Sequence, residues 1–195
     1  MGLSQISIHR SDMTDQPKMS LESSKDASDA PEREILTWEL FGEASRELTE
    51  QIVTSGWIPD LIVAIARGGL IPAGAVSYAM GVKACGTMNV EFYTGVGQTL
   101  EEPQLLPPLM DVSAMNGKRV LIVDDVADSG KTLKMVMDLV KEHGLSLDGE
   151  TRVKVDARCA VIYKKPVSII EPDYVWRHTD KWINFPWSTL PTITA

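Results

Sequence analysis

Three short apolar runs stand out in the hydropathy pattern, and each is followed by polar or glycine-containing residues. They cover residues 61–66 (LIVAIA), 120–123 (VLIV) and 158–163 (RCAVIY). Uninterrupted runs of this length are typical of strands buried on both faces of a parallel sheet. Before the first run, and again between the second and the third, apolar residues recur with helical spacing. The two stripes are Phe41, Ala44, Leu48 and Ile52, and Leu133, Val136, Met137 and Val140. This alternation predicts an α/β fold with a mainly parallel sheet of about five strands flanked by helices.

Glycine and proline residues and changes in periodicity predict where these elements begin and end. The first stripe predicts a helix from Trp38 to about Ser55, which Gly56 caps and Pro59 prevents from continuing. A further helix is expected over residues 73–79 and a short strand over residues 174–176. The N-terminal residues show no periodicity and lack the apolar core of a signal peptide. We therefore expect a disordered acidic tail over residues 1–34 and one domain over residues 35–195, with a small C-terminal hood mainly at 166–195.

Composition narrows the class of protein further. With 195 residues, a net charge of −8 and a pI of about 4.9, the chain has the size of one domain and lacks the basic surface of a nucleic-acid binder. No apolar run approaches the length that spans a bilayer. Cys85 and Cys159 lie far apart without metal-ligand spacing, which favours a reducing compartment. We expect a cytoplasmic protein with neither a nucleic acid nor a membrane as partner.

The second apolar run leads into the most informative segment, VLIVDDVADSGKT. Asp124 and Asp125 follow the strand, at the edge where ligands bind in open α/β sheets. A small, Gly-containing loop then enters a helix, whose free N–H groups favour a phosphate. Carboxylates beside a phosphate are explained if they bind sugar hydroxyls or a divalent cation, so a sugar phosphate fits both demands. A Walker A loop is excluded because Asp125 stands where that motif needs glycine; an ordinary solvated strand end is the simpler alternative.

The first apolar run ends in a related way, in Arg67-Gly68-Gly69 before a helix. Glycine lets the backbone approach a ligand closely, and arginine offers two parallel hydrogen bonds to phosphate. Taken alone, the glycines are better explained by the turn itself. Together with the acidic segment, they describe a ligand that carries a phosphate group at each end of a ribose.

These two segments carry a resemblance to type I phosphoribosyltransferases. VLIVDDVADSGKT is similar to the family's phosphoribosyl-diphosphate (PRPP) signature, and AIARGGLIP resembles its diphosphate loop; the resemblance covers roughly residues 36–190. It implies the type I phosphoribosyltransferase fold. It also implies that Asp124 and Asp125 hold the ribose hydroxyls, with Asp125 near Mg²⁺. The residues that would meet phosphate groups are Ala127, Asp128, Ser129, Gly130, Lys131 and Thr132 at the 5′-phosphate, and Ala66, Arg67 and Gly68 at the diphosphate.

The C-terminal region resembles the base-recognising hood of microbial 6-oxopurine phosphoribosyltransferases, of the xanthine-guanine and hypoxanthine type. This implies that Lys165 contacts the 6-oxo group, Trp182 stacks on the purine and the backbone of Ile183 recognises its edge; Lys164 is the alternative to Lys165. Asp128 would be the general acid/base at N7. Ser188 replaces an acidic residue of some members, which leaves recognition of the purine 2-position open. For Trp176 and Trp187 we expect a packing role only.

The resemblance implies a Mg²⁺-dependent enzyme of purine salvage. It would transfer the 5-phosphoribosyl group from PRPP to a purine base (xanthine, guanine or hypoxanthine), release diphosphate and form a homo-oligomer. The alternatives are a non-catalytic PRPP- or nucleotide-sensing regulator on the same fold, and a phosphoribosyltransferase for another acceptor. Residues 93–110, rich in glycine and proline, are expected to form a lid that excludes water; a surface loop without a gating role is the alternative.

Overall fold

The fold is taken from a computed structural model, which describes residues 32–91, 94–95, 98–99, 104–105, 117–146 and 152–194. The predicted tail therefore lies outside the described residues, apart from its last three positions. The expected lid lies outside them as well, except for the short strands β4 (Thr94–Gly95), β5 (Gln98–Thr99) and β6 (Gln104–Leu105). Both expectations stay predictions.

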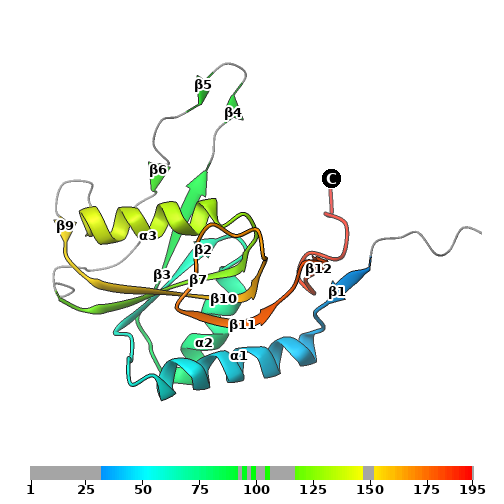
Figure 1. The fold of residues 1–195 in the computed structure, drawn as a ribbon, viewed down its shortest axis with the longest axis horizontal. Helices are drawn as coiled ribbons and strands as arrows, with labels where there is room; N and C mark the ends of the chain where they lie inside the picture. The colour runs from blue at the N-terminus through cyan, green and yellow to red at the C-terminus, as the bar shows by residue number, and fades with distance from the viewer. Residues whose placement is uncertain are drawn as a thin grey trace, which may run out of the picture. The chain divides into compact units, whose positions relative to one another are not determined.

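A six-stranded sheet forms the centre of the described part (Figure 1). Five of its strands are parallel: β2 (Leu61–Ala66), β3 (Cys85–Glu91), β7 (Arg119–Ala127), β10 (Asp156–Lys164) and β11 (Tyr174–His178). The strand order is β11-β10-β7-β2-β3-β6, and the short β6 pairs with β3 in the antiparallel sense. The predicted α/β fold with about five parallel strands is confirmed.

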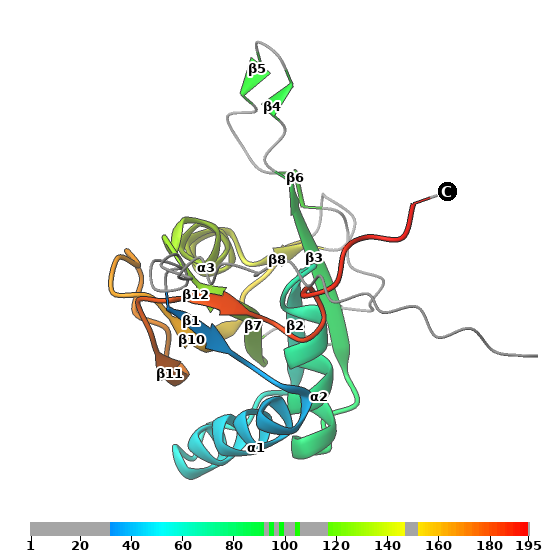
Figure 2. The same ribbon diagram turned by 90° about the vertical axis from the view of Figure 1, so that its right-hand side faces the viewer.

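Helices cover both faces of this sheet, and Figure 2 shows α1 and α2 on one side and α3 on the other. α1 (Trp38–Thr54) begins where the Thr37 hydroxyl accepts a hydrogen bond from the Leu40 N–H at 3.2 Å. The predicted stripe from Phe41 to Ile52 is buried against the sheet together with α2 (Leu70–Met80). The second predicted stripe is the buried face of α3 (Lys131–His143). In the described part of the chain, no helix has the length and apolar character needed to cross a bilayer.

β7 is longer than the apolar run that predicted it. Asp124 and Asp125 lie inside this strand, because its pairing with β10 continues as far as Ala127 opposite Lys164. Its register with β2, in contrast, ends at Val123 opposite Ala64. From β2 the chain continues to β3, towards one edge of the sheet. From β7 it continues to β10 and β11, towards the opposite edge. β2 and β7 therefore flank the switch point of the sheet, where open α/β folds bind their ligands.

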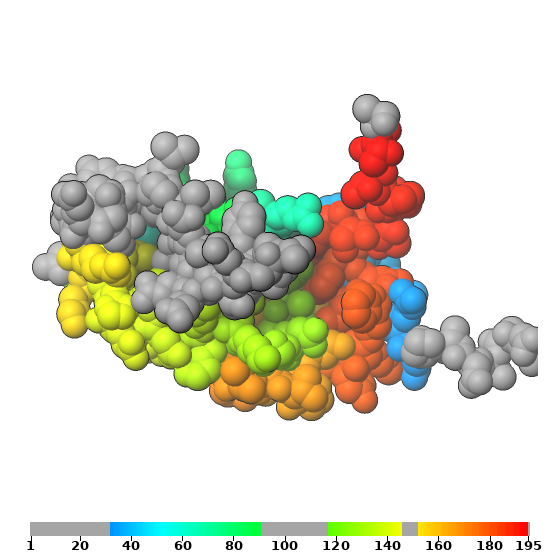
Figure 3. Space-filling model, turned by 90° about the horizontal axis from the view of Figure 1, so that it is seen from above, coloured from blue at the N-terminus to red at the C-terminus, as the bar shows by residue number. Residues whose placement is uncertain are grey.

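Three two-stranded sheets complete the fold. β4 pairs with β5, β8 (Leu145–Ser146) pairs with β9 (Arg152–Val153), and β1 (Arg33–Ile35) pairs with β12 (Trp182–Asn184) in the parallel sense. Arg33 and Glu34, which the sequence analysis assigned to the N-terminal tail, are thus strand residues. Figure 3 shows the blue N-terminal strand beside the orange and red C-terminal segment. The predicted hood is therefore completed by residues from the other end of the domain.

Candidate active site

The acidic pair on β7 is held largely out of water. The Asp125 N–H donates a hydrogen bond to the Asp124 carboxylate at 2.9 Å. Burial raises the pKa of Asp124 well above its ordinary value, and the neighbouring charge of Asp125 raises it further. Burial also raises the pKa of Asp125. Two carboxylates in this state are stabilised by any ligand that donates hydroxyl hydrogen bonds to them or brings a cation.

The loop after β2 lies directly against this pair. A Cβ atom placed on Gly68 would be 2.5 Å from the Asp125 carboxyl carbon, and a Cβ atom on Gly69 would meet the backbone oxygen of Val123. Both glycines are therefore needed for close packing of the loop against β7 as well as for turning, and their contact with a diphosphate stays a prediction. The Ala66–Arg67 peptide bond is cis, and Arg67 is exposed. The fold thus brings the two sequence motifs into contact.

A small cavity of about 80 Å³ lies where β7 passes into α3. Its lining residues are Asp124, Val126, Asp128, Ser129, Gly130, Lys131, Thr132 and Leu133. Gly130 precedes the helix with φ of +74°, so that the loop turns sharply into the first helical turn. The Lys131 N–H donates to the Ser129 hydroxyl at 3.4 Å. Because the first N–H groups of a helix have no partner within the helix, they and the helix dipole make the cavity suitable for an anion. We call it the phosphate cavity.

Ala127 is the one residue of the predicted phosphate segment 127–132 that does not line this cavity. Its side chain is buried in the core, beside α3. Its carbonyl accepts a hydrogen bond from the Lys165 N–H at 3.0 Å. Any contact of Ala127 with a ligand would therefore have to come from its backbone.

A second cavity, of about 350 Å³, opens next to the phosphate cavity and shares Val126 and Asp128 with it. Its other lining residues are Arg33, Lys165, Trp182, Ile183, Asn184, Phe185, Ser188 and Thr189. This size falls at the lower end of small-molecule pockets. All three predicted base-binding residues thus meet around one space, which we call the base cavity. Asp128 is the charged residue common to both cavities.

The two candidate lysines differ in their surroundings. The Lys165 ammonium group lies at the base cavity and donates hydrogen bonds to the backbone oxygens of Asp180, at 3.3 Å, and of Lys181. The Lys164 ammonium group instead forms an ion pair with Glu171 at 2.8 Å and does not line the cavity. This arrangement favours Lys165 as the residue that faces a ligand.

The segment that carries Lys165 also supports the phosphate loop. The Ile169 N–H donates to the Ser129 carbonyl at 3.0 Å. A side chain on Gly130 would collide with Ser168 and Ile170. The loop at the phosphate cavity is therefore packed against residues 165–170, which fixes the two cavities relative to each other.

The tryptophans divide into two groups. Trp176 contacts Tyr163 edge-on at 5.4 Å and donates to Glu47 at 2.8 Å. Trp187 stacks on Phe185 at 5.0 Å between ring centroids and packs against the core. Both pack as expected. The side chain of Trp182, in contrast, lies at the base cavity in a residue that is 66% exposed, so its ring face is available to a planar ligand.

Arg33, Asn184, Phe185 and Thr189 line the base cavity without having been singled out in the sequence. Asn184, Phe185 and Thr189 follow Ile183 closely, and this proximity is the signal that would have found them. Arg33 offers no such signal, because β1 is three residues long and its partner β12 lies at the other end of the domain.

Asp124 and Asp125 are also the residues suited to Mg²⁺. Among the described residues, no group of three or more His, Cys, Asp or Glu side chains forms a site of its own for a metal. Mg²⁺ is, however, commonly bound through one or two carboxylates, with substrate phosphates and water completing its shell. A buried carboxylate pair beside an open glycine loop fits that type of site.

Sequence comparison identifies the class of protein to which this fold and site belong. Residues 32–191 match the family described as phosphoribosyl transferase domain, so the chain belongs to that family. It is a phosphoribosyltransferase. The xanthine-guanine phosphoribosyltransferase of Gluconobacter oxydans is 32% identical over 158 residues, covering 80% of this chain and 84% of the relative. The enzyme of the same name from a Ruegeria species is 31% identical over 178 residues, covering 85% and 92%.

Solved structures of phosphoribosyltransferases also share this fold. The purine phosphoribosyltransferase from Pyrococcus horikoshii is 36% identical, with a TM-score of 0.64 over 84% of this chain and 98% of that one. The xanthine-guanine-hypoxanthine phosphoribosyltransferase of Helicobacter pylori, at 20% identity, has a TM-score of 0.64 over 80% and 94%, and supports the fold alone.

Proposed function

We propose that this enzyme transfers the 5-phosphoribosyl group of PRPP to the N9 atom of a 6-oxopurine and releases diphosphate, as a step of purine salvage. The observation that carries the proposal is the position of Asp128, which lines both the phosphate cavity and the base cavity. A ligand that joins a phosphate to a base through a ribose would pass this residue. The names of the curated relatives agree with a purine as acceptor.

The two cavities divide PRPP and the base between them. The loop from Asp128 to Thr132 would bind the 5′-phosphate at the start of α3. Asp124 and Asp125 would accept hydrogen bonds from the ribose hydroxyls, and Ala66, Arg67 and Gly68 would meet the diphosphate. Asp125, beside Gly68, would also hold Mg²⁺. When bound, this ion lowers the cost of the charge that gathers on the departing diphosphate.

The reaction breaks the bond between C1 of the ribose and the diphosphate oxygen, which keeps the electron pair. N9 of the base forms the new bond to C1, and the base gives up its N7 proton to the Asp128 carboxylate. Positive charge develops on the ribose ring while the bond breaks. The carboxylates of β7 are held in place by the strand, so they would stabilise that charge without reorganising.

The base would be recognised by three groups at the base cavity. The Lys165 ammonium group donates to the 6-oxo group, the Trp182 ring stacks on the purine, and the backbone of Ile183 meets its edge. Lys164 is unsuited to the first role because its charge is paired with Glu171. We also propose a cytoplasmic location and a homo-oligomer, both on the family resemblance.

Replacement of Asp128 by asparagine tests this mechanism. Asp128→Asn should lower kcat by about 100-fold or more, the usual contribution of a positioned proton acceptor, while the Kd for PRPP changes little. Diphosphate release gives kcat, and calorimetric titration gives the Kd. Equal losses in turnover and PRPP affinity would contradict the acid/base role. PRPP binding without diphosphate release by the wild type, for any purine or pyrimidine, would favour the sensing regulator instead.

A further inference from the structure

Arg33 brings a positive charge to the base cavity from the N-terminal strand. We infer that Arg33 determines specificity at the purine 2-position, favouring an oxygen there (xanthine) over an amino group (guanine). The inference rests on the proposed function, because that function orients the base. If Asp128 meets N7 and Lys165 meets the 6-oxo group, the edge that carries C2 faces the rest of the cavity. Its remaining polar lining residues are Arg33, Asn184, Ser188 and Thr189.

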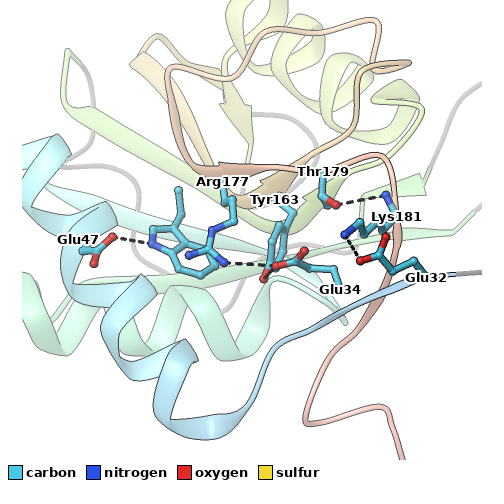
Figure 4. A network of polar contacts seen from close by, with 8 residues as sticks. Glu32, Glu34, Glu47, Tyr163, Arg177, Thr179 and Lys181 are labelled. Atoms are coloured by element: carbon cyan, nitrogen blue, oxygen red, sulfur yellow. Dashed lines mark hydrogen bonds and ion pairs between the residues drawn. The ribbon is translucent and has the colours of Figure 1, made fainter.

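The strand that carries Arg33 is held in place on both sides of this residue. Glu34 accepts a hydrogen bond from the Tyr163 hydroxyl and forms an ion pair with Arg177, each at 3.3 Å. Glu32 forms an ion pair with Lys181 at 2.7 Å. Figure 4 shows Glu34 and Glu32 pointing to these two sets of partners. Although β1 has three residues, its flanking contacts fix the position from which Arg33 reaches the cavity.

The partners of Arg33 determine which groups remain free for a ligand. Its guanidinium group donates to the Asn184 side-chain oxygen at 3.1 Å. Because arginine has donors only, this contact requires the amide oxygen of Asn184 to face Arg33, and that oxygen is already engaged as an acceptor. Among the described residues, Asn184 is the one partner of this guanidinium group, which leaves its further N–H groups available to a ligand. A base that approaches this end of the cavity therefore meets a cation with donors to spare.

Two backbone carbonyls of the segment after Ile183 already accept hydrogen bonds. The Phe185 carbonyl accepts from the Thr189 hydroxyl at 2.6 Å and from the Ser188 N–H at 3.1 Å. The Asn184 carbonyl accepts from the Leu36 N–H at 3.1 Å. Among the described residues that line the cavity, Asp128 is the only carboxylate, and the proposed function places it at N7. A 2-amino group would bring two donors towards the donor groups of Arg33, whereas a 2-oxo group supplies an acceptor for them.

Charge strengthens this preference. Xanthine loses a proton readily near neutral pH, and its anion is attracted by Arg33, whereas guanine and hypoxanthine stay neutral there. Hydrogen bonds to a charged group are stronger than those between neutral groups. The ratio of kcat/KM for xanthine to that for hypoxanthine should therefore rise as the pH is raised through the ionisation of xanthine.

Arg33→Met tests the inference, with hypoxanthine as the internal control because it carries no 2-substituent. The kcat/KM values for xanthine, guanine and hypoxanthine are measured at saturating PRPP and Mg²⁺. The substitution should lower the value for xanthine by about 10- to 100-fold and that for hypoxanthine by less than about threefold. It should also abolish the pH dependence of the ratio. Arg33 is exposed, so its replacement should leave thermal unfolding nearly unchanged.

Two further variants sharpen the test. Arg46→Met removes an exposed arginine of α1 and should leave all three values unchanged. Asn184→Asp places an acceptor carboxylate beside Arg33 and should shift the preference towards guanine. An equal loss for all three bases in Arg33→Met, or a wild-type preference for guanine that this variant does not alter, would overturn the inference. A wild type that uses none of the three bases would instead refute the proposed function.

Discussion

A methyl group added at Gly68 should push the loop after β2 away from the carboxylate of Asp125 on β7. A Cβ atom on this residue would lie 2.5 to 2.6 Å from the three carboxyl atoms of Asp125, whereas ordinary contacts begin near 3.4 Å. In Gly68→Ala, either the diphosphate loop or the carboxylate must therefore move by about 1 Å. A displacement of that size between substrate-positioning groups typically costs about 100-fold in rate.

The expected result is a kcat/KM for PRPP that falls by about 100-fold, which corresponds to about 2.7 kcal/mol of transition-state stabilisation. The strain should also lower the free energy of unfolding by about 1–3 kcal/mol, which chemical denaturation measures. Diphosphate release and calorimetric titration with PRPP give the functional change. Folding of the variant is checked by circular dichroism.

Gly74 offers a matched control on α2, the helix that follows the same loop. A Cβ atom on Gly74 meets nothing within 4 Å. Gly74→Ala should therefore leave activity unchanged and stabilise the fold by about 0.5–1 kcal/mol, the usual gain of alanine over glycine in a helix. A folded Gly68→Ala protein that keeps both its PRPP affinity and its turnover would refute the assignment of this loop to the diphosphate.

Three other predictions follow from how far individual side chains are buried or exposed. Burial raises the pKa of Asp124 in the folded state, so the stability of the fold decreases as the pH rises from the unfolded pKa of this group through its raised value. Asp124→Asn removes this titration and should therefore raise Tm at neutral pH and flatten the fall of Tm with pH. The same variant should weaken PRPP binding. An unchanged Tm at neutral pH would contradict this. Trp182→Ala removes a stacking face, so it should lower kcat/KM for the base by about tenfold or more with little change in Tm. Trp187→Ala should instead lower the free energy of unfolding by up to about 3 kcal/mol. The reverse pattern would assign stacking to Trp187. Burial raises the pKa of Cys159 to about 12, so a thiol reagent near neutral pH should titrate only Cys85 in the folded protein and both thiols in denaturant; two fast-reacting thiols before unfolding would contradict it.

The elements with local signals could be predicted from the sequence. β2, β7 and β10 appear as short apolar runs, and α1 and α3 appear as apolar stripes with the buried residues correctly assigned. β3, with the sequence CGTMNVE, has no such run and was not predicted. The continuation of β7 through Asp124 and Asp125 could not be predicted in this way. The continuation depends on backbone hydrogen bonds to β10, and these form whether the side chains are polar or apolar.

The same distinction applies to the candidate site. Residues 128–132 and the residues Lys165, Trp182 and Ile183 were predicted from local segments that resemble the family, and the structure places them around two adjacent cavities. Arg33 was missed because its place depends on pairing with β12 at the far end of the chain. The choice between Lys164 and Lys165 depends on which way each side chain leaves the end of β10, and the partner of Lys164, Glu171, is brought near by the following turn. Such tertiary contacts leave no local pattern.

The most direct test of the account is to identify the product formed from PRPP, Mg²⁺ and each 6-oxopurine. The account predicts that wild-type protein converts at least one of xanthine, hypoxanthine and guanine to its nucleoside 5′-monophosphate, with one diphosphate released per product. Chromatography of the nucleotides and a coupled diphosphate assay measure the two products independently. Diphosphate release without any nucleotide, or no turnover of the three bases by a folded protein that binds PRPP, would contradict it.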